Sequence, residues 1–236
     1  MELRLLSTET ERRIFAARTE QIRAKHGAGF KERPRSRLAK IHLTFGNLYA
    51  LFENDGDPAE RMIAGLVMHD LEMFPQTCPQ PDLSHLAPRS VVEISELWSC
   101  AIGAGALARA GAAIMAGLLD AKAILAYLGV KPFDGTPFYR AAGFVNAGEP
   151  VEYPYLETLK GEPILAQPMI LGGESLAKLT RVFSQLIIEA SPDHSVLRFR
   201  NFLKGRNAGG RPVFVDDDAP RAAARPMHEE NAASMQ

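Results

Sequence analysis

A strand, a helix of small residues and a second strand follow one another between Val91 and Leu128, and this succession constrains the fold more than any other part of the chain. Val91–Cys100 is rich in β-branched and other apolar residues, which predicts a strand. Ala106–Leu119 repeats its larger apolar residues at helical spacing, and its Ala and Gly residues allow close packing on a sheet. Ala121–Leu128 is typical of a buried strand. Two strands joined in this way are expected to lie parallel, with a right-handed crossover.

The chain before this unit predicts a short strand, a helix and a hairpin. Met1–Leu6 alternates polar and apolar residues, and Thr8 has the capping-box relation to a Glu three residues later, so a helix is expected to begin there. Ile41–Glu53 and Met62–Leu71 are apolar segments joined by Asn-Asp-Gly-Asp-Pro, a strong turn signal. They are expected to pair as an antiparallel hairpin. The Pro-rich segment Phe74–Arg89 follows and is expected to be irregular.

The chain after this unit predicts a short helix, further strands and then helices. Pro137–Ala142 is expected to be helical, with strand from Phe144 onward and the last strand at Pro163–Leu171. Amphipathic spacing predicts helices over Glu174–Ala190 and Val196–Lys204. The order of elements predicts an α/β fold: a central mixed β-sheet flanked by helices, with extra C-terminal helices.

Composition narrows the classes of function. The 236 residues are 46% hydrophobic, which is enough for one sizeable core. With 27 basic and 28 acidic residues the formal net charge is −1, and no basic, aromatic patch points to nucleic acid. No apolar run approaches the roughly 20 residues of a membrane span, and the N-terminus lacks a signal-peptide region. Two cysteines fit a reducing compartment, so a cytoplasmic location is expected. The histidines lack metal-ligand spacing, so no metal is expected.

Two carboxylates lie within the strand VVEISELWSC. Alternation along a strand places Glu93 on one face with Leu97, and Glu96 on the other face with Trp98. A carboxylate in apolar surroundings is costly unless it is paired or used. Burial also raises its pKa, which suits a general base near neutral pH. Glu93 is therefore our candidate base.

Other interpretations of these residues stay open. Glu93 would be purely structural if it formed an ion pair with Arg89 or Arg140. His69, on the neighbouring strand, could replace it as base, although a structural histidine is the commoner case. Cys100 is expected to be an inert thiol rather than a nucleophile.

The segment CAIGAGA joins the strand to the helix with two glycines. Such a turn before a helix N-terminus lets backbone N–H groups converge on a phosphate. A tight turn without a ligand is the alternative, and the residues alone favour it. If the strand bulges and splays near Leu97–Ser99, a backbone amide there would be available to stabilise an oxyanion.

FYRAAGF, Phe138–Phe144, resembles the aromatic-Tyr-basic-x-x-Gly-Phe element of the GNAT superfamily of N-acyltransferases. This resemblance implies that Tyr139 lies beside an acyl thioester and protonates the leaving thiolate. The glycine loop resembles the family's Q/R-x-x-G-x-G/A pattern. It implies that the amides of Gly103, Ala104 and Gly105 bind the pyrophosphate of the donor's pantetheine arm.

A narrower resemblance covers roughly residues 15–171 and concerns the autoinducer synthases, which make N-acylhomoserine lactones, and the similar N-acyl amino acid synthases. Glu93-Ile94-Ser95 resembles their Glu-x-Ser, and Phe144–Tyr153 resembles their Gly-Glu-Pro segment. Since these enzymes take acyl groups from acyl carrier protein, the resemblance implies an acyl-ACP donor more than acyl-CoA. The basic segment Lys31–Arg37 would meet an acidic carrier protein, with ordinary surface charge as the alternative.

The resemblance also implies a reaction and a substrate site. Glu96 stands at a position that shapes the site of the amine, and Trp98 and Phe138 are expected to line an acyl channel or to lie in the core. We therefore predict an N-acyltransferase that moves an acyl group from a thioester to a small amine or amino acid. Leu97 and Ser99 would contribute backbone amides.

Two rivals remain. Met68, Glu96 and Cys100 depart from the patterns above, which favours a catalytically inactive GNAT-like protein that binds an acyl group or a partner. The second rival is a membrane-active protein on the same scaffold, because thermostable haemolysin-like proteins also resemble it.

The predicted organisation has three parts. Residues 1–172 would form the GNAT-like domain, and residues 173–204 a helical extension that packs on this domain or on a partner. Residues 205–236 have little to bury and are expected to be a disordered tail.

Overall fold

The computed structural model describes residues 1–26, 30–32, 43–53, 61–101, 103–130, 134–185, 187–193, 195–199, 202–206 and 212–216. Two compact units divide the chain, residues 1–199 and residues 200–236. In the second unit the structure describes an antiparallel hairpin of β12 (Phe202–Arg206) and β13 (Pro212–Asp216). The tail predicted to be disordered therefore contains strand residues, and its remaining residues, 207–211 and 217–236, lie outside those described.

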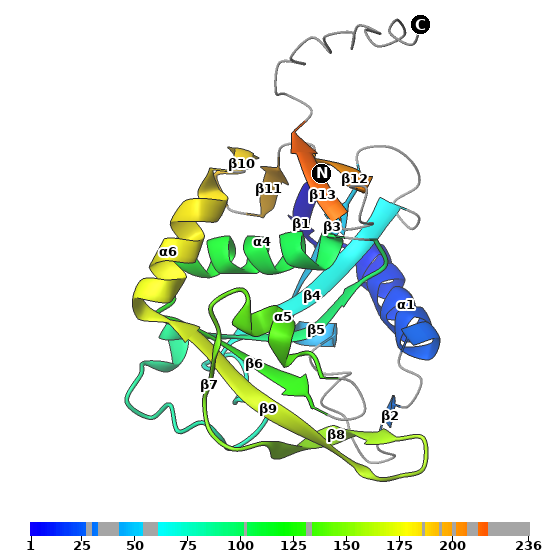
Figure 1. The fold of residues 1–236 in the computed structure, drawn as a ribbon, viewed down its shortest axis with the longest axis vertical. Coiled ribbons are helices and arrows are strands. Elements are labelled where there is room, and N and C mark those ends of the chain that lie inside the picture. The colour runs from blue at the N-terminus through cyan, green and yellow to red at the C-terminus, as the bar shows by residue number, and fades with distance from the viewer. Residues whose placement is uncertain are drawn as a thin grey trace, which may run out of the picture. The chain divides into compact units, whose positions relative to one another are not determined.

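The first unit is built on one mixed sheet in the order β10–β11–β1–β3–β4–β5–β6–β9–β8–β2, with β7 paired to β9 (Figure 1). Its strands are β1 (Glu2–Leu5), β2 (Phe30–Glu32), β3 (Asn47–Phe52), β4 (Met62–Asp70), β5 (Val91–Ser99), β6 (Ala123–Gly129), β7 (Val145–Asn146), β8 (Val151–Thr158), β9 (Pro163–Gly172), β10 (Ile187–Ala190) and β11 (Val196–Phe199). Its α-helices include α1 (Glu9–His26), α4 (Ala104–Leu118), α5 (Thr136–Arg140) and α6 (Gly173–Ser184).

Strand pairing confirms the predicted centre of the sheet. β3 and β4 form the expected antiparallel hairpin. β5 and β6, which α4 connects along the chain, pair in parallel. The predicted α/β class, with a mixed sheet and helices on both faces, is confirmed. Within the described part of the chain, no helix combines the length and apolarity of a membrane span.

The start of α1 follows from the predicted capping box. The Glu11 backbone N–H donates to Thr8 Oγ1 at 3.2 Å, and the Thr8 backbone N–H donates to Glu11 Oε2 at 3.2 Å. The strand predicted over Ile41–Glu53 is wrong at its start, because residues 43–45 form a helical turn and β3 begins only at Asn47. Arg12 stabilises this turn by donating to the carbonyl oxygens of Leu43, Thr44 and Gly46.

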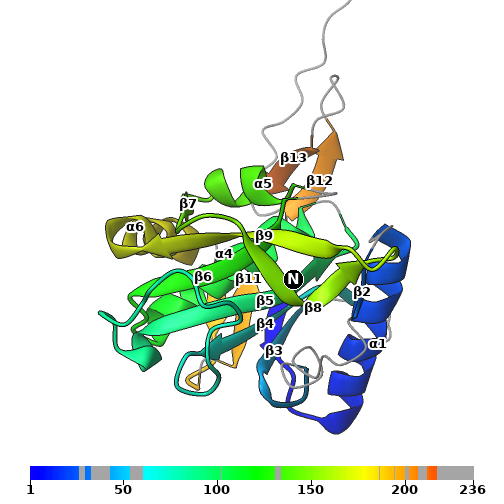
Figure 2. The same ribbon diagram turned by 90° about the horizontal axis from the view of Figure 1, so that it is seen from below.

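Different helices cover the two faces of the sheet, as Figures 1 and 2 show. Side chains alternate along β3, so Leu48 packs with Phe15 of α1 on one face. Leu51 belongs to the cluster on the other face, which also contains Leu107 of α4 and Leu176 of α6. The helix α6 therefore packs on the same domain as α4.

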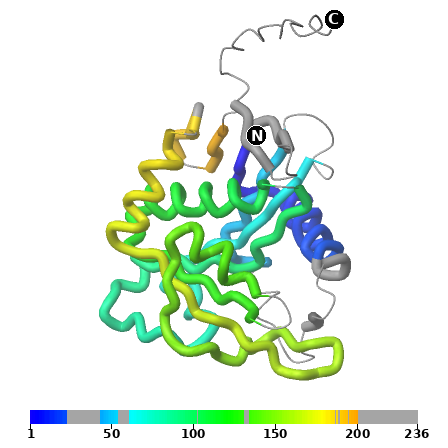
Figure 3. Tube along the Cα trace, viewed as in Figure 1, coloured from blue at the N-terminus to red at the C-terminus, as the bar shows by residue number. Residues whose placement is uncertain are grey.

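The predicted irregular excursion between β4 and β5 is confirmed, and Figure 3 draws it as a long loop. It contains one short 3-10 helix, η1 (Pro88–Ser90). Cys78 and Leu83 of the excursion pack against Leu125 and Tyr127 of β6. This places the excursion on the face of the sheet opposite α4.

A bulge in β5 changes the predicted facing of its second half. Gly65 pairs with Trp98 and Val67 with Ser95, so β5 has one residue more than β4 over this stretch. Glu96 is the bulged residue, and its backbone φ angle is +52°. Beyond the bulge the alternation reverses. Leu97 packs on the α4 side, and Trp98 packs against Phe15 of α1 with ring centroids 5.5 Å apart. The predicted pairing of Leu97 with the face of Glu93 is therefore wrong.

The predicted C-terminal helices are largely wrong. The helix predicted to reach Ala190 ends at Ser184, and β10 and β11 form an antiparallel hairpin, with β11 pairing to β1 at its other side. Leu197 and Phe199 are buried while Arg198 between them is exposed, which is strand alternation. The described residues of the region predicted as a helix over Val196–Lys204 therefore belong to β11 and β12. The spacing of so few apolar residues fits both the helical period of 3.6 and the strand period of 2. The edge of β1 that β3 does not occupy is available for pairing, and this favours a strand.

Candidate active site

A cavity of about 340 Å³ opens where β5 and β6 separate. The two strands pair only between Val91–Ile94 and Ala123–Ala126. β6 then continues to Gly129 against β9, while β5 continues to Ser99 against β4. The bulge at Glu96 lies at this point of divergence. The volume falls in the range of small-molecule sites, roughly 300–1,000 Å³.

Six elements, and the residue before one of them, contribute to the wall of this cavity. They supply Ile94, Ser95, Glu96, Leu97, Trp98 and Ser99 from β5, Gly105 and Arg109 from α4, Tyr127, Leu128 and Gly129 from β6, Gly135, Phe138 and Tyr139 from α5 and the residue before it, and Tyr153, Leu156, Ile164 and Ala166 from β8 and β9. Seven of the eleven predicted site residues are among them: Glu96, Leu97, Trp98, Ser99, Gly105, Phe138 and Tyr139. Glu93, His69, Gly103 and Ala104 do not line the cavity.

The predicted base, Glu93, is buried beside the cavity. Its side chain is 1% exposed. Its Oε2 accepts a hydrogen bond from the Thr77 backbone N–H at 2.9 Å, and its Oε1 accepts one from the Thr77 hydroxyl. Desolvation raises the pKa of Glu93 to about 7, although the Thr77 hydrogen bonds act in the opposite direction. The carboxyl is thus poised to take up or release a proton near neutrality.

The two arginines considered as ion-pair partners of Glu93 contact other residues instead. Arg89 forms an ion pair with Glu72, and Arg140 donates to Asn146 Oδ1 at 3.1 Å. The predicted structural ion pair with either arginine is therefore wrong. His69 Nε2 lies 3.9 Å from Glu93 Oε2, and both side chains are fully buried. His69 therefore belongs to the surroundings of Glu93 rather than to the cavity wall.

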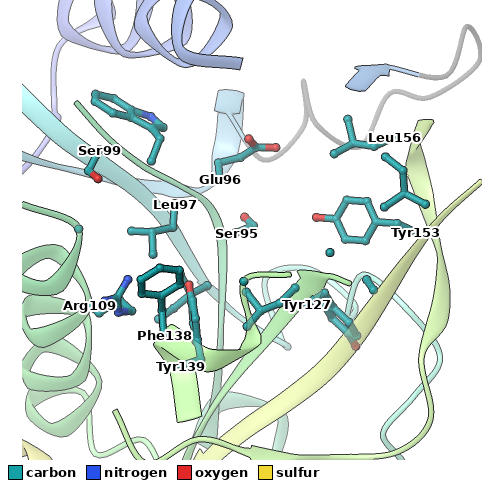
Figure 4. Close-up of a pocket in the computed structure, with 18 residues that line it drawn as sticks. Ser95, Glu96, Leu97, Ser99, Arg109, Tyr127, Phe138, Tyr139, Tyr153 and Leu156 are labelled. Atoms are coloured by element: carbon teal, nitrogen blue, oxygen red, sulfur yellow. The ribbon is translucent and has the colours of Figure 1, made fainter. Parts of the chain in front are cut away.

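Tyr139 lies in the cavity wall with a cation above its ring. The guanidinium carbon of Arg109 is 5.4 Å from the ring centroid, and Phe144 contacts the ring edge-on. Burial raises the pKa of Tyr139 to about 12, against the opposing charge of Arg109. A phenol with this pKa stays protonated at neutral pH and can donate its proton. Figure 4 shows Leu97, Phe138, Tyr139 and Arg109 grouped at one end of the cavity.

The glycine loop lies at the same end. Gly103 precedes α4 with a φ of +81°, a conformation that glycine adopts without strain. A Cβ added to Gly105 would lie 3.0 Å from Ser99 Oγ and 3.8 Å from Arg109 Nη1, so loop, strand and cation are close together. Cys100 donates its thiol to the Ile63 carbonyl oxygen at 3.4 Å and does not line the cavity.

Two buried polar atoms of the cavity wall lack a hydrogen-bond partner within the described residues. They are Ser95 Oγ and Trp98 Nε1, and their residues are 6% and 7% exposed. An unsatisfied buried donor costs about 1–3 kcal/mol.

Sequence reasoning missed several residues that form or surround this site. Arg109 stands out as a lone charge in an Ala- and Gly-rich helix, and this signal was available. Tyr153 and Tyr155 share a strand face, as their spacing of two also indicates. Thr77 lies in the irregular excursion, where no periodicity relates it to Glu93.

Among the residues that the structure describes, no group of three or more His, Cys, Asp or Glu side chains is arranged to hold a metal ion.

Comparison with known proteins supports the fold. No protein-family model and no curated protein sequence matches the chain. The solved structure of FeeM, an N-acyl amino acid synthase from uncultured soil microbes, is similar with a TM-score of 0.52 and 11% identity, over 78% of this chain and 98% of that one. The predicted GNAT-like fold is confirmed by this likeness.

Two more solved structures are similar at lower scores. One is the NatC complex bound to Gag peptide and CoA, with a TM-score of 0.48 and 16% identity over 73% of this chain and 99% of that one. The other is a Bacillus subtilis acetyltransferase in complex with CoA, with a TM-score of 0.46 and 13% identity over 72% and 97%.

Proposed function

We propose that this protein is an N-acyltransferase that moves an acyl group from a thioester donor to the amine of a small molecule or amino acid. The observation that carries the proposal is the cavity between the diverging ends of β5 and β6. It brings together a bulged strand edge, the Tyr139 side chain and Gly105 in the first turn of α4. FeeM, whose fold is similar, is an N-acyl amino acid synthase, and the proposal takes up that analogy.

The residues of the cavity fit the demands of acyl transfer. The amine nitrogen attacks the thioester carbonyl, the C–N bond forms, and the C–S bond then breaks. β5 has no partner on its β6 side beyond Ile94 in the described residues, and amides near Leu97–Ser99 would stabilise the oxyanion. Tyr139 would protonate the leaving thiolate. Glu93 would accept the proton that the amine loses.

The donor would be an acyl group carried on a phosphopantetheine arm. Arg109 is the cation among the described residues of the cavity wall, and together with the N-terminus of α4 it provides positive charge for the arm's phosphate. We favour acyl carrier protein over coenzyme A, in a cytoplasmic setting, on the resemblance of Glu93-Ile94-Ser95 to the autoinducer synthases. The basic segment 31–37 that would meet the carrier protein lies largely outside the described residues.

An inactive protein that binds an acyl group or a partner is the second candidate. One observation favours it, namely that Glu93 does not line the cavity. An enzyme needs a route by which the amine's proton reaches this carboxyl. A binding protein needs none.

A thiol-release assay separates the two candidates. Acyl carrier protein and coenzyme A thioesters of several chain lengths are offered with a panel of amines and amino acids. We expect amine-dependent thiol release from one donor class, and we expect Glu93→Gln to lower the rate about 10²–10⁴-fold while the protein stays folded. If the folded wild-type protein releases no thiol with any pair, while acyl species co-purify with it in intact-mass spectra, the binding function is correct instead.

A further inference from the structure

Glu93 is separated from the cavity, and the side chains around it offer a route between the two. The carboxyl is buried and does not line the cavity, whereas Tyr153 does. Three hydroxyl groups lie between these positions. They come from Thr77 in the excursion after β4 and from Tyr155 and Tyr153 in β8.

The three hydroxyls lie in series between Glu93 and the cavity, and hydrogen bonds form at the two ends of the series. Thr77 Oγ1 donates to Glu93 Oε1. The Thr77 hydroxyl also lies beside the Tyr155 side chain, where it acts to lower the Tyr155 pKa against the larger effect of burial. The hydroxyl oxygens of Tyr153 and Tyr155 lie 2.6 Å apart, and either hydroxyl can donate to the other. The three hydroxyls therefore connect the cavity wall to Glu93 through successive contacts.

The local structure of β8 explains how two tyrosines come to lie in series. Glu152 pairs with Leu165 of β9 and Glu157 with Pro163, so the four residues between them exceed what β9 can match. Pro154 lies in this stretch and cannot donate a ladder hydrogen bond. Tyr153 and Tyr155 flank it on one face, with ring centroids 4.5 Å apart. In Figure 4 the Tyr153 hydroxyl points toward Ser95, across the cavity.

We propose that Tyr153, Tyr155 and Thr77 form a proton relay that connects a substrate amine in the cavity to the buried carboxylate of Glu93. The proposal rests on the N-acyltransferase function above. The ammonium or attacking amine gives its proton to the Tyr153 oxygen, Tyr153 gives its own to Tyr155, Tyr155 to Thr77, and Thr77 to Glu93 Oε1. One N–H bond breaks and one O–H bond forms on Glu93. Each hydroxyl regains the proton it gave, so no charge remains on the relay.

The electrostatic surroundings favour a relay over a charged tyrosine. Desolvation raises the pKa of both tyrosines, so a free phenolate is disfavoured at each step. Glu93 is the group that gains or loses net charge. The titratable groups that face it are His69 from β4, Cys78 from the excursion, Tyr127 from β6, and Tyr153 and Tyr155 from β8.

A double-mutant cycle tests the relay during turnover. Tyr155→Phe keeps the ring but removes the hydroxyl, and we expect kcat/KM to fall on the order of 10²-fold. In a Glu93→Gln background the same substitution should cost nothing further, because the relay then leads to no base. Tyr49→Phe, at another buried tyrosine, is the matched control and should leave the rate unchanged. Full activity of Tyr155→Phe, or an equal loss in the Glu93→Gln background, would overturn the relay.

A second measurement needs no substrate. The carbonyl stretch of protonated Glu93, identified by its loss in Glu93→Gln, shifts when the proton exchanges for deuterium. After rapid mixing with D₂O at about pH 5, we expect this exchange to be at least about tenfold slower in Tyr155→Phe and in Thr77→Val than in wild type or Tyr49→Phe. Equal exchange rates would refute the relay. The two proposals can fail separately. If exchange is slow in the variants but the wild-type protein releases no thiol, the relay is upheld and the acyltransferase function is refuted.

Discussion

Replacing Glu93 with Gln should make this protein more stable at neutral pH, although the same change removes the proposed base. The carboxyl is 1% exposed and its pKa is raised by desolvation from 4.5 to about 7. Each pKa unit is worth about 1.4 kcal/mol, so the ionised carboxylate costs the folded state about 3 kcal/mol relative to the unfolded chain. Gln has a similar shape and carries no charge, and its carbonyl oxygen can still accept the Thr77 N–H hydrogen bond.

The sign of the pH dependence follows from which state holds the proton more tightly. The folded state has the higher pKa, so the unfolded chain loses the Glu93 proton first as pH rises. Stability contributed by the protonated carboxyl is complete below about pH 4.5 and is lost as pH rises to about 7. Wild-type protein should therefore lose about 3 kcal/mol more than Glu93→Gln across this window.

Urea unfolding of both proteins between about pH 4 and about pH 8 measures this difference directly. All other titrating groups are common to the two proteins, so their contributions largely cancel in the comparison. The m-values should agree, which shows that the same surface is exposed on unfolding. A difference in unfolding free energy that stays constant from acid to neutral pH would refute the reasoning, since it would mean that burial does not raise the Glu93 pKa.

Further predictions concern the acid, the packing behind the bulge and the first helix. Tyr139→Phe should slow thiol release roughly ten- to a thousand-fold if the phenol donates its proton, and an unchanged rate would leave it a packing role. Gly65→Ala should lower the unfolding free energy by about 1–3 kcal/mol, because the new Cβ would lie 2.6 Å from Trp98 Cζ2 and closer still to Phe15. Thr8→Ala should cost about 1 kcal/mol through the lost cap, and calorimetry would measure both losses.

The sequence was sufficient for the central part of the fold because local signals and topology agree there. The strand at Val91, the Ala-rich helix and the strand ending near Leu128 each have a clear period, and a parallel crossover is the arrangement that joins them. At Val196–Phe199 the same kind of signal failed. Four residues are too few to separate a period of 2 from a period of 3.6, and the decision depends on pairing with β1 nearly 200 residues away.

The candidate site was predicted in part for a similar reason. Glu96, Trp98 and Tyr139 could be named because they belong to contiguous motifs, and all of them line the cavity. Thr77 and Tyr155 could not be connected to Glu93, because their contact depends on where an irregular excursion crosses the sheet. The facing of Trp98 was missed because one inserted residue reverses the alternation of everything after it.

The strained residue Glu96 shows why the bulge belongs to the site rather than to the packing alone. A non-glycine residue with a φ of +52° costs roughly 1–2 kcal/mol, and such strain persists only where the surrounding structure holds it. The bulge lies where β5 leaves β6, and it has two consequences that a regular strand could not produce together. It turns Trp98 onto α1, and it directs Leu97 toward the end of the cavity that holds Tyr139. A regular β5 would place Leu97 on the face of Glu93 and remove it from Tyr139. The strain is therefore linked to the same geometry that opens the cavity.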